Sequence, residues 1–131
     1  MVGSVDFHLL FQNGRAKDAV ERYREIFDDY ELLRLDLYEP GTGPEGQVQV
    51  AEFCVHGRRF VCIDSPIPHE WDMTPGVAPF VVCDDEAEMN RLFDALSEGG
   101  TVYMPIGAYG FGRLFAWVED AFGVSWLLNI E

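Results

Sequence analysis

Basic side chains are scarce in this sequence. Its 131 residues include nine Lys and Arg against 23 Asp and Glu, so the formal net charge at pH 7 is −14. A surface with such an excess of negative charge repels phosphate backbones and anionic lipid headgroups. We therefore expect no nucleic-acid partner and no membrane partner.

Long hydrophobic runs are also missing. No stretch reaches the roughly 18 apolar residues that suggest a membrane-spanning helix. The opening residues MVGSVD lack the basic start and apolar core of a secretory signal peptide. These absences predict a cytoplasmic protein.

The cysteines are few and lack a paired spacing. Cys54, Cys62 and Cys83 form no C-x-x-C motif, and each lies in an apolar, strand-like run. Cysteine in such a run behaves as a small hydrophobic residue, so buried free thiols are predicted. A nucleophilic cysteine would need a nearby base and an electropositive setting, and the sequence indicates neither.

Several well-known catalytic and cofactor motifs are absent as well. The sequence contains no G-x-S-x-G elbow, P-loop, dinucleotide fingerprint or H-E-x-x-H motif. It also has no Gly-rich strand-to-helix turn of the kind that binds S-adenosylmethionine, and no doubly wound pattern. The motifs therefore give no support to five classes of protein: hydrolases, NTPases, Rossmann-fold enzymes, zincins and methyltransferases.

Apolar residues, in contrast, are plentiful: 48% of the chain is hydrophobic and 14% is aromatic, with ten Phe. This length and composition predict a single packed domain over residues 1–131. Period-two alternation predicts strands, and apolar residues at helical spacing predict two helices. The expected strands are 5–11, 31–39, 47–56, 59–64, 78–83, 101–106, 113–119 and 124–130, and the helices are 15–27 and a segment from Asp84 or Asp85 to Gly99.

The order of these elements repeats. Residues 5–65 and 78–130 each read strand, helix, strand, strand, strand, and the Pro-rich loop 66–77 joins them. We therefore predict an α+β fold of paired βαβββ modules, in which two curved mixed sheets enclose a cleft.

Three segments of the chain carry a recognisable pattern: LLFQNGRAKDAVERYREIF, APFVVCDDEAEMNRLFDALSEGG and YGFGRLFAWVEDAFGVSW. Together they resemble the PhnB-like group of the vicinal oxygen chelate superfamily, which contains glyoxalase I, extradiol dioxygenases and bleomycin-resistance proteins. The group has also been labelled 3-demethylubiquinone-9 3-methyltransferase-like. The most specific signature is D-x-F-G-V-x-W, which consists of Asp120, Phe122, Gly123, Val124 and Trp126. The resemblance spans nearly the whole chain and implies the same paired modules, often in a homodimer.

In metal-using members of the superfamily, the resemblance implies one divalent ion held by side chains from four strands. The first-strand ligand would fall near His8, which alternates away from Phe7 and Leu9. The mid-chain position offers Ala78 or Pro79, and neither can bind a metal.

The two remaining ligand positions are also poor. The last strand should supply a Glu four residues after Gly123, and this position is Leu127. The fourth strand of the first half ends in Ile63 and Asp64, with Glu52 on the preceding strand as a poorer candidate. Because a catalytic site of this type keeps about three protein ligands, we expect no cofactor and no metal. His8 is the one remnant ligand if a divalent metal does bind.

Without a metal, the cleft would bind its ligand by apolar enclosure with a few polar groups. The candidate residues are His8, Trp71, Tyr103, Tyr109, Phe111, Arg113 and Trp117. Arg113 would hold a carboxylate or phenolate, and the Gly-rich AYGFG loop would act as a lid. The alternatives are core packing for the aromatics, a surface salt bridge for Arg113 and a buried, hydrogen-bonded imidazole for His8. His56 and His69 are expected to be solvated loop residues.

Three functional hypotheses follow. The first is a protein that binds a small apolar or aromatic molecule in its cleft without the usual metal site. The second is a metal-dependent lyase, isomerase or dioxygenase of the same superfamily. The third is a non-catalytic structural or regulatory dimer.

Overall fold

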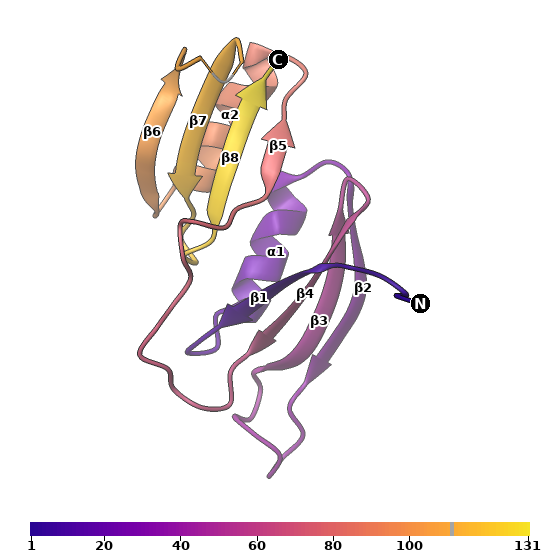
Figure 1. Cartoon of the computed structure of the whole chain (residues 1–131). Coiled ribbons are helices and arrows are strands. Elements are labelled where there is room, and N and C mark those ends of the chain that lie inside the picture. Colours follow the sequence, from indigo (N-terminus) through magenta and orange to yellow (C-terminus); the bar gives the residue numbers. More distant parts are fainter. Residues whose placement is uncertain (111) are drawn as a thin grey trace. The chain divides into compact units, whose positions relative to one another are not determined.

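A computed structural model describes residues 1–110 and 112–131 (Figure 1). The chain divides into two compact units, Met1–Asp72 and Met73–Glu131, and each is described by itself. None of the helices within the described ranges is long and apolar enough to cross a membrane.

The first unit is a four-stranded mixed sheet with one helix. Its elements are β1 (Phe7–Phe11), α1 (Ala16–Ile26), β2 (Tyr30–Leu37), β3 (Val48–Val55) and β4 (Arg58–Asp64). The strand order is β1-β4-β3-β2, in which β1 runs parallel to β4 and the other neighbours are antiparallel. This is the predicted βαβββ arrangement.

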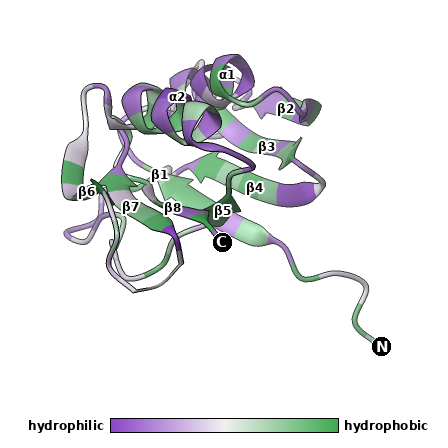
Figure 2. Cartoon of the chain, turned by 90° about the horizontal axis from the view of Figure 1, so that it is seen from above, coloured by the Kyte–Doolittle hydropathy of each residue, from purple (hydrophilic) through white to green (hydrophobic). Residues whose placement is uncertain are grey.

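The second unit repeats this topology. Its elements are β5 (Phe80–Val82), α2 (Glu86–Ser97), β6 (Thr101–Gly107), β7 (Leu114–Glu119) and β8 (Ser125–Ile130). The order is β5-β8-β7-β6, again with the first strand parallel to the last. The predicted α+β class with paired βαβββ modules is confirmed. Within each unit the helix covers one face of its sheet (Figure 2), and we call the opposite side the open face.

The core of the first unit forms between α1 and the sheet. The helix buries Ala19, Val20 and Tyr23 on one face, and the Tyr23 ring lies 5.8 Å from the ring of Phe53. Phe53 in turn stacks on Phe60 at 5.1 Å. Each fully buried side chain of this size contributes about 1.5–3 kcal/mol through burial, so these contacts hold the helix on the sheet.

A buried carboxylate closes the N-terminal end of α1. Asp64 is fully buried, and its two oxygens accept hydrogen bonds from the backbone N–H groups of Ala16, at 3.0 Å, and Val48, at 2.8 Å. Arg15 at the N-cap makes no side-chain capping bond. Asp64 therefore supplies the cap from a distant strand and ties α1 to the start of β3.

The core of the second unit lies beneath α2. Met89, Leu92 and Leu96 are buried on the helix, and buried Val118 and Trp126 lie in strands β7 and β8. The predicted cap is confirmed at Asp85, whose Oδ1 accepts a hydrogen bond from Glu88 N at 2.8 Å.

The D-x-F-G-V-x-W signature is a structural device in the β7–β8 hairpin. Asp120 Oδ1 accepts hydrogen bonds from Phe122 N (2.9 Å) and Val124 N (3.0 Å), while Oδ2 accepts one from Trp126 Nε1 (2.9 Å). Gly123 has a φ of +88°, which favours glycine. The motif holds the turn and fixes the buried Trp126 ring.

The thiols are largely as expected. Cys62 and Cys83 are buried and Cys54 is half-buried, all three free. Burial raises the pKa of Cys62 to about 12 and also raises the pKa of Cys83. A thiol that stays protonated at neutral pH is a poor nucleophile, so these two cysteines are core residues.

Candidate functional site

The open face of the β5–β8 sheet is lined by apolar side chains. Cross-strand partners place Phe80 beside Leu127, Leu127 beside Trp117, and Trp117 beside Met104. Side chains of directly paired residues point to the same side of a sheet, so these four residues form one row across all four strands. Phe80 at one end is 55% exposed, which means that the row is only partly covered.

The ring of Trp117 is held at the centre of this row. Its Nε1 donates a hydrogen bond to Ser125 Oγ at 2.7 Å, and that hydroxyl donates to Pro75 O at 3.3 Å. The ring of Tyr103 packs against Trp117 with 4.8 Å between the centroids. Trp117 is therefore fixed in orientation by contacts on two sides.

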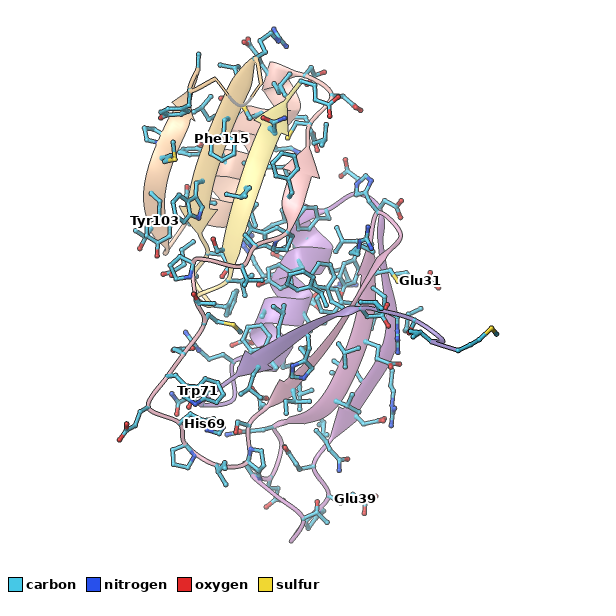
Figure 3. All side chains as sticks on the ribbon, viewed as in Figure 1. Glu31, Glu39, His69, Trp71, Tyr103 and Phe115 are labelled. Carbon is cyan, nitrogen blue, oxygen red and sulfur yellow. The ribbon has the colours of Figure 1, made fainter. Side chains whose placement is uncertain are left out.

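A second aromatic pair lies along the same face. The Tyr109 ring meets Phe115 edge-on at 6.2 Å, and its hydroxyl donates to Pro105 O at 2.7 Å. A Cβ at Gly107 would lie 3.3 Å from the Tyr109 ring, so glycine at this position lets the ring pack closely over β6. Figure 3 shows Tyr103 and Phe115 on neighbouring strands.

Three of the predicted site residues, Tyr103, Tyr109 and Trp117, are thus brought onto one sheet face. Arg113 is exposed two residues before Phe115, and its backbone N–H donates to Ile130 O at 2.8 Å. Phe111 lies outside the described residues.

Several residues on this face were missed by the sequence analysis. Phe80, Phe115, Glu119, Ser125 and Asn129 all share it through the strand pairings. Alternation around Trp117 indicates Phe115 and Glu119 as its neighbours on the same side. The other three depend on long-range register, which a single sequence does not supply.

The open face of the β1–β4 sheet is chemically different. His8 pairs with Val61, and Val61 pairs with Glu52, so His8 and Glu52 share a row. Glu52 forms an ion pair with Arg59, which also pairs with Asp6. His8 is exposed, so the alternative of a buried imidazole is wrong. This face carries partly exposed ion pairs around Arg59 beside the aliphatic side chains of Val61 and Ile63.

Trp71 belongs to an ordered loop after β4. Its ring stacks on His69 at 4.2 Å, and His69 Nε2 lies 2.8 Å from Ser65 Oγ. Gln12 binds both residues through their backbone: its Nε2 donates to Trp71 O at 2.8 Å, and its Oε1 accepts from His69 N at 2.9 Å. Figure 3 shows both rings in this segment. His69 is therefore a half-buried, hydrogen-bonded residue and not the freely solvated imidazole that was expected.

The residues at the ligand positions that the resemblance implies do not fit a divalent metal. Leu127 lies in the middle of the apolar row, where its side chain offers no donor atom. Asp64 is buried on the helix side of its sheet with both oxygens occupied by backbone N–H groups. Within residues 1–110 and 112–131, no group of three His, Cys, Asp or Glu side chains lies in a metal-binding arrangement.

Comparisons with known proteins agree with this architecture. Residues 4–129 match the family model described as 3-demethylubiquinone-9 3-methyltransferase. A comparison with curated protein sequences found no match.

Solved structures include similar chains. A putative 3-demethylubiquinone-9 3-methyltransferase, PhnB protein, from Bacillus cereus is 36% identical, with a TM-score of 0.91 over 98% of this chain and 99% of that chain. A protein from Pseudomonas aeruginosa is 27% identical, with a TM-score of 0.83 over 98% of each chain.

A more distant structure shares the fold alone. It is the glyoxylase/bleomycin resistance protein/dioxygenase domain from Frankia, which is 12% identical with a TM-score of 0.66 over 99% of this chain and 92% of that chain. The family match spans nearly the whole sequence, and the same two βαβββ modules are present. The chain therefore belongs to the 3-demethylubiquinone-9 3-methyltransferase family and is similar to the PhnB protein.

Proposed function

We propose that this family member binds a small aromatic or apolar molecule, and that the open face of the β5–β8 sheet makes the main contacts. The observation that carries the proposal is the row formed by Phe80, Leu127, Trp117 and Met104. Contiguous apolar surface that remains partly exposed is typical of a ligand-binding or interaction site.

The fixed orientation of Trp117 supports a binding role. A ring that is already ordered by Ser125 and Tyr103 loses little conformational freedom when a ligand stacks on it.

We also propose that binding requires no divalent metal. The side chains of Leu127, Ala78 and Pro79 supply no donor atoms at two of the four ligand positions that the resemblance implies. Metal analysis of protein purified without an affinity tag tests this. Stoichiometric metal that is lost in His8→Ala would overturn it and would favour the metal-dependent lyase, isomerase or dioxygenase.

The binding proposal is tested by a thermal-shift panel of small aromatic compounds, with Trp117→Leu compared against Trp71→Leu. A ligand at 100 times its dissociation constant adds about 2.7 kcal/mol to the free energy of unfolding. We expect wild type and Trp71→Leu to shift alike and Trp117→Leu to lose the shift. Loss of the shift in Trp71→Leu alone would move the site to the loop after β4.

The homodimer implied by the family resemblance is a separate prediction. Size-exclusion chromatography with light scattering measures it directly. If the protein is dimeric and no compound in a broad panel shifts its melting temperature, the structural or regulatory dimer replaces ligand binding as the preferred function.

A further inference from the structure

The polar groups on the open face of the β5–β8 sheet indicate which kind of molecule it binds. This step rests on the proposed function, because it assumes that a ligand contacts this face. The key cluster consists of Trp117, Tyr103 and Glu119, which we call the ring–carboxylate cluster. The Tyr103 hydroxyl donates a hydrogen bond to Glu119 Oε1 at 2.9 Å while its ring packs on Trp117.

The aromatic donors of this face are already used within the protein. Trp117 Nε1 donates to Ser125, the Tyr103 hydroxyl donates to Glu119, and the Tyr109 hydroxyl donates to Pro105 O. The hydrogen bond to Glu119 also raises the pKa of Tyr103, so this phenol keeps its proton. An anionic ligand would find none of these three groups free to donate.

Acceptor capacity, in contrast, remains. An ionised carboxylate offers about four lone-pair sites, and Tyr103 occupies one of those on Glu119. Asn129 lies directly opposite Phe115 on the same face and is only 3% exposed. Its Oδ1 accepts no hydrogen bond from any residue that the structure describes, and a buried acceptor without a partner is costly. Both groups favour a ligand that donates hydrogen bonds.

The charge of the second unit favours the same chemistry. Residues 73–131 contain two Arg against nine Asp and Glu. Arg91 lies on α2 and pairs with Glu88, which leaves Arg113, before β7, as the second cation. Aromatic faces beside a carboxylate attract an ammonium group through both the ring quadrupole and the ion pair.

We propose that the ring–carboxylate cluster binds an organic cation, an ammonium group carried on a small aromatic or aliphatic body. The ammonium lies against the faces of Trp117 and Tyr103 and donates a hydrogen bond to the free oxygen of Glu119. The apolar body lies along the row towards Leu127 and Phe80.

Three matched probes test this proposal: 2-phenylethylammonium, neutral 2-phenylethanol and the anion 3-phenylpropionate. Isothermal titration calorimetry gives the affinities, and the ¹⁵N-indole resonance of Trp117 locates the site. We expect the ammonium to bind about tenfold or more tightly than the alcohol, as cation–π contacts and an ion pair together provide. The anion should bind least tightly of the three. Raising the salt concentration should lower the affinity for the ammonium and leave the other affinities unchanged.

Variants separate the contributions. Glu119→Gln should lower the affinity for 2-phenylethylammonium to that for 2-phenylethanol, and the affinity for 2-phenylethanol should stay the same. Asp94→Asn is the control, because it also removes one negative charge but lies on the exposed side of α2 and not on this sheet face. It should change neither of the two affinities. Equal binding of all three probes would overturn the cation proposal and leave the aromatic site intact.

Two other outcomes would also be decisive. If the protein binds 3-phenylpropionate more tightly than the other two probes and Arg113→Gln loses this preference, the cation proposal is overturned. The ligand is then an anion held by Arg113. No binding of any probe at millimolar concentration, with an unperturbed Trp117 resonance, would overturn both the cation and the proposed aromatic site.

Discussion

The two units share one topology but differ in the chemistry of their open faces. The β1–β4 sheet presents ion pairs around Arg59 and an exposed His8, whereas the β5–β8 sheet presents Trp117 and Phe115 among aliphatic side chains. The strand order does not dictate what the open face carries, because side chains on that face do not form the helix-packed core. The face is therefore free to diverge, and the aromatic one is the face that we propose as the small-molecule surface.

The units also use buried carboxylates differently. Asp64 binds two backbone N–H groups and ties a helix to a strand in the first unit. Asp120 binds two backbone N–H groups and the Trp126 indole within one hairpin of the second. One carboxylate joins distant segments and the other shapes a local turn.

The largest expected effect comes from removing these carboxylates. Asp120→Ala leaves three donors without an acceptor and Asp64→Ala leaves two, so we expect losses of about 4 and about 3 kcal/mol in the free energy of unfolding. Urea denaturation measures both. Asp94→Ala, which is exposed on α2, should stay within about 0.5 kcal/mol of wild type. Losses below about 1 kcal/mol at Asp64 and Asp120 would refute this account of the two units.

High pH should affect the first unit through Cys62. The pKa of this thiol is about 12 in the folded chain and 9.0 without its surroundings, so the unfolded state loses its proton first. The contribution of the protonated Cys62 thiol to the free energy of unfolding is complete below about pH 9, and it is lost progressively as the pH rises towards about 12. One pKa unit corresponds to about 1.4 kcal/mol, so the shift of Cys62 from 9.0 to about 12 amounts to about 4 kcal/mol in total.

Urea denaturation of wild type and Cys62→Ala at several pH values between about 8 and about 11.5 measures this effect. This range begins below the pKa of the unfolded state and approaches the pKa of the folded state. The decline should be shallower in the variant. Tyr30, whose pKa burial raises to about 12, adds to the decline in both proteins, and Tyr30→Phe removes that part. Parallel curves for wild type and Cys62→Ala would contradict the prediction.

The smallest effects concern the open faces themselves. The Arg59 pairs are partly exposed, with 34% of the Arg59 side chain accessible, so Arg59→Gln should cost less than about 1 kcal/mol and less still at high salt. Trp117→Leu should cost about 2 kcal/mol, because a half-buried ring loses packing that salt does not screen. Denaturation at low and high NaCl compares the two. A salt-dependent loss at Trp117 would erase the contrast between the faces.

Much of the fold was predictable from local pattern. Alternating apolar residues located the strands, and helical spacing located α1 and α2, because these patterns reflect which side chains a layered core must bury. The ends were less predictable. β5 begins at Phe80 and not at 78, since Pro79 has no N–H to donate and takes part only through its carbonyl, which accepts from Leu127 N.

The candidate site was predictable in composition but not in arrangement. Tyr103, Tyr109 and Trp117 could be selected as aromatic residues near a Gly-rich loop, yet their neighbours Phe80 and Asn129 come from strands distant in sequence. Bulges in the pairing of β6 with β7 also shift the register next to Tyr103, and a shift of one residue reverses the face to which a side chain points.

The sequence by itself determined the family, the order of elements and the presence of a residue without a side-chain donor atom at Leu127, because these depend on residue identity and local spacing. Only the tertiary structure decided that Leu127 lies in an apolar row beside Trp117, and that Asp120 holds the Trp126 indole in the β7–β8 hairpin. Those facts depend on strand register and side-chain contacts, which arise when segments far apart in the chain pack together.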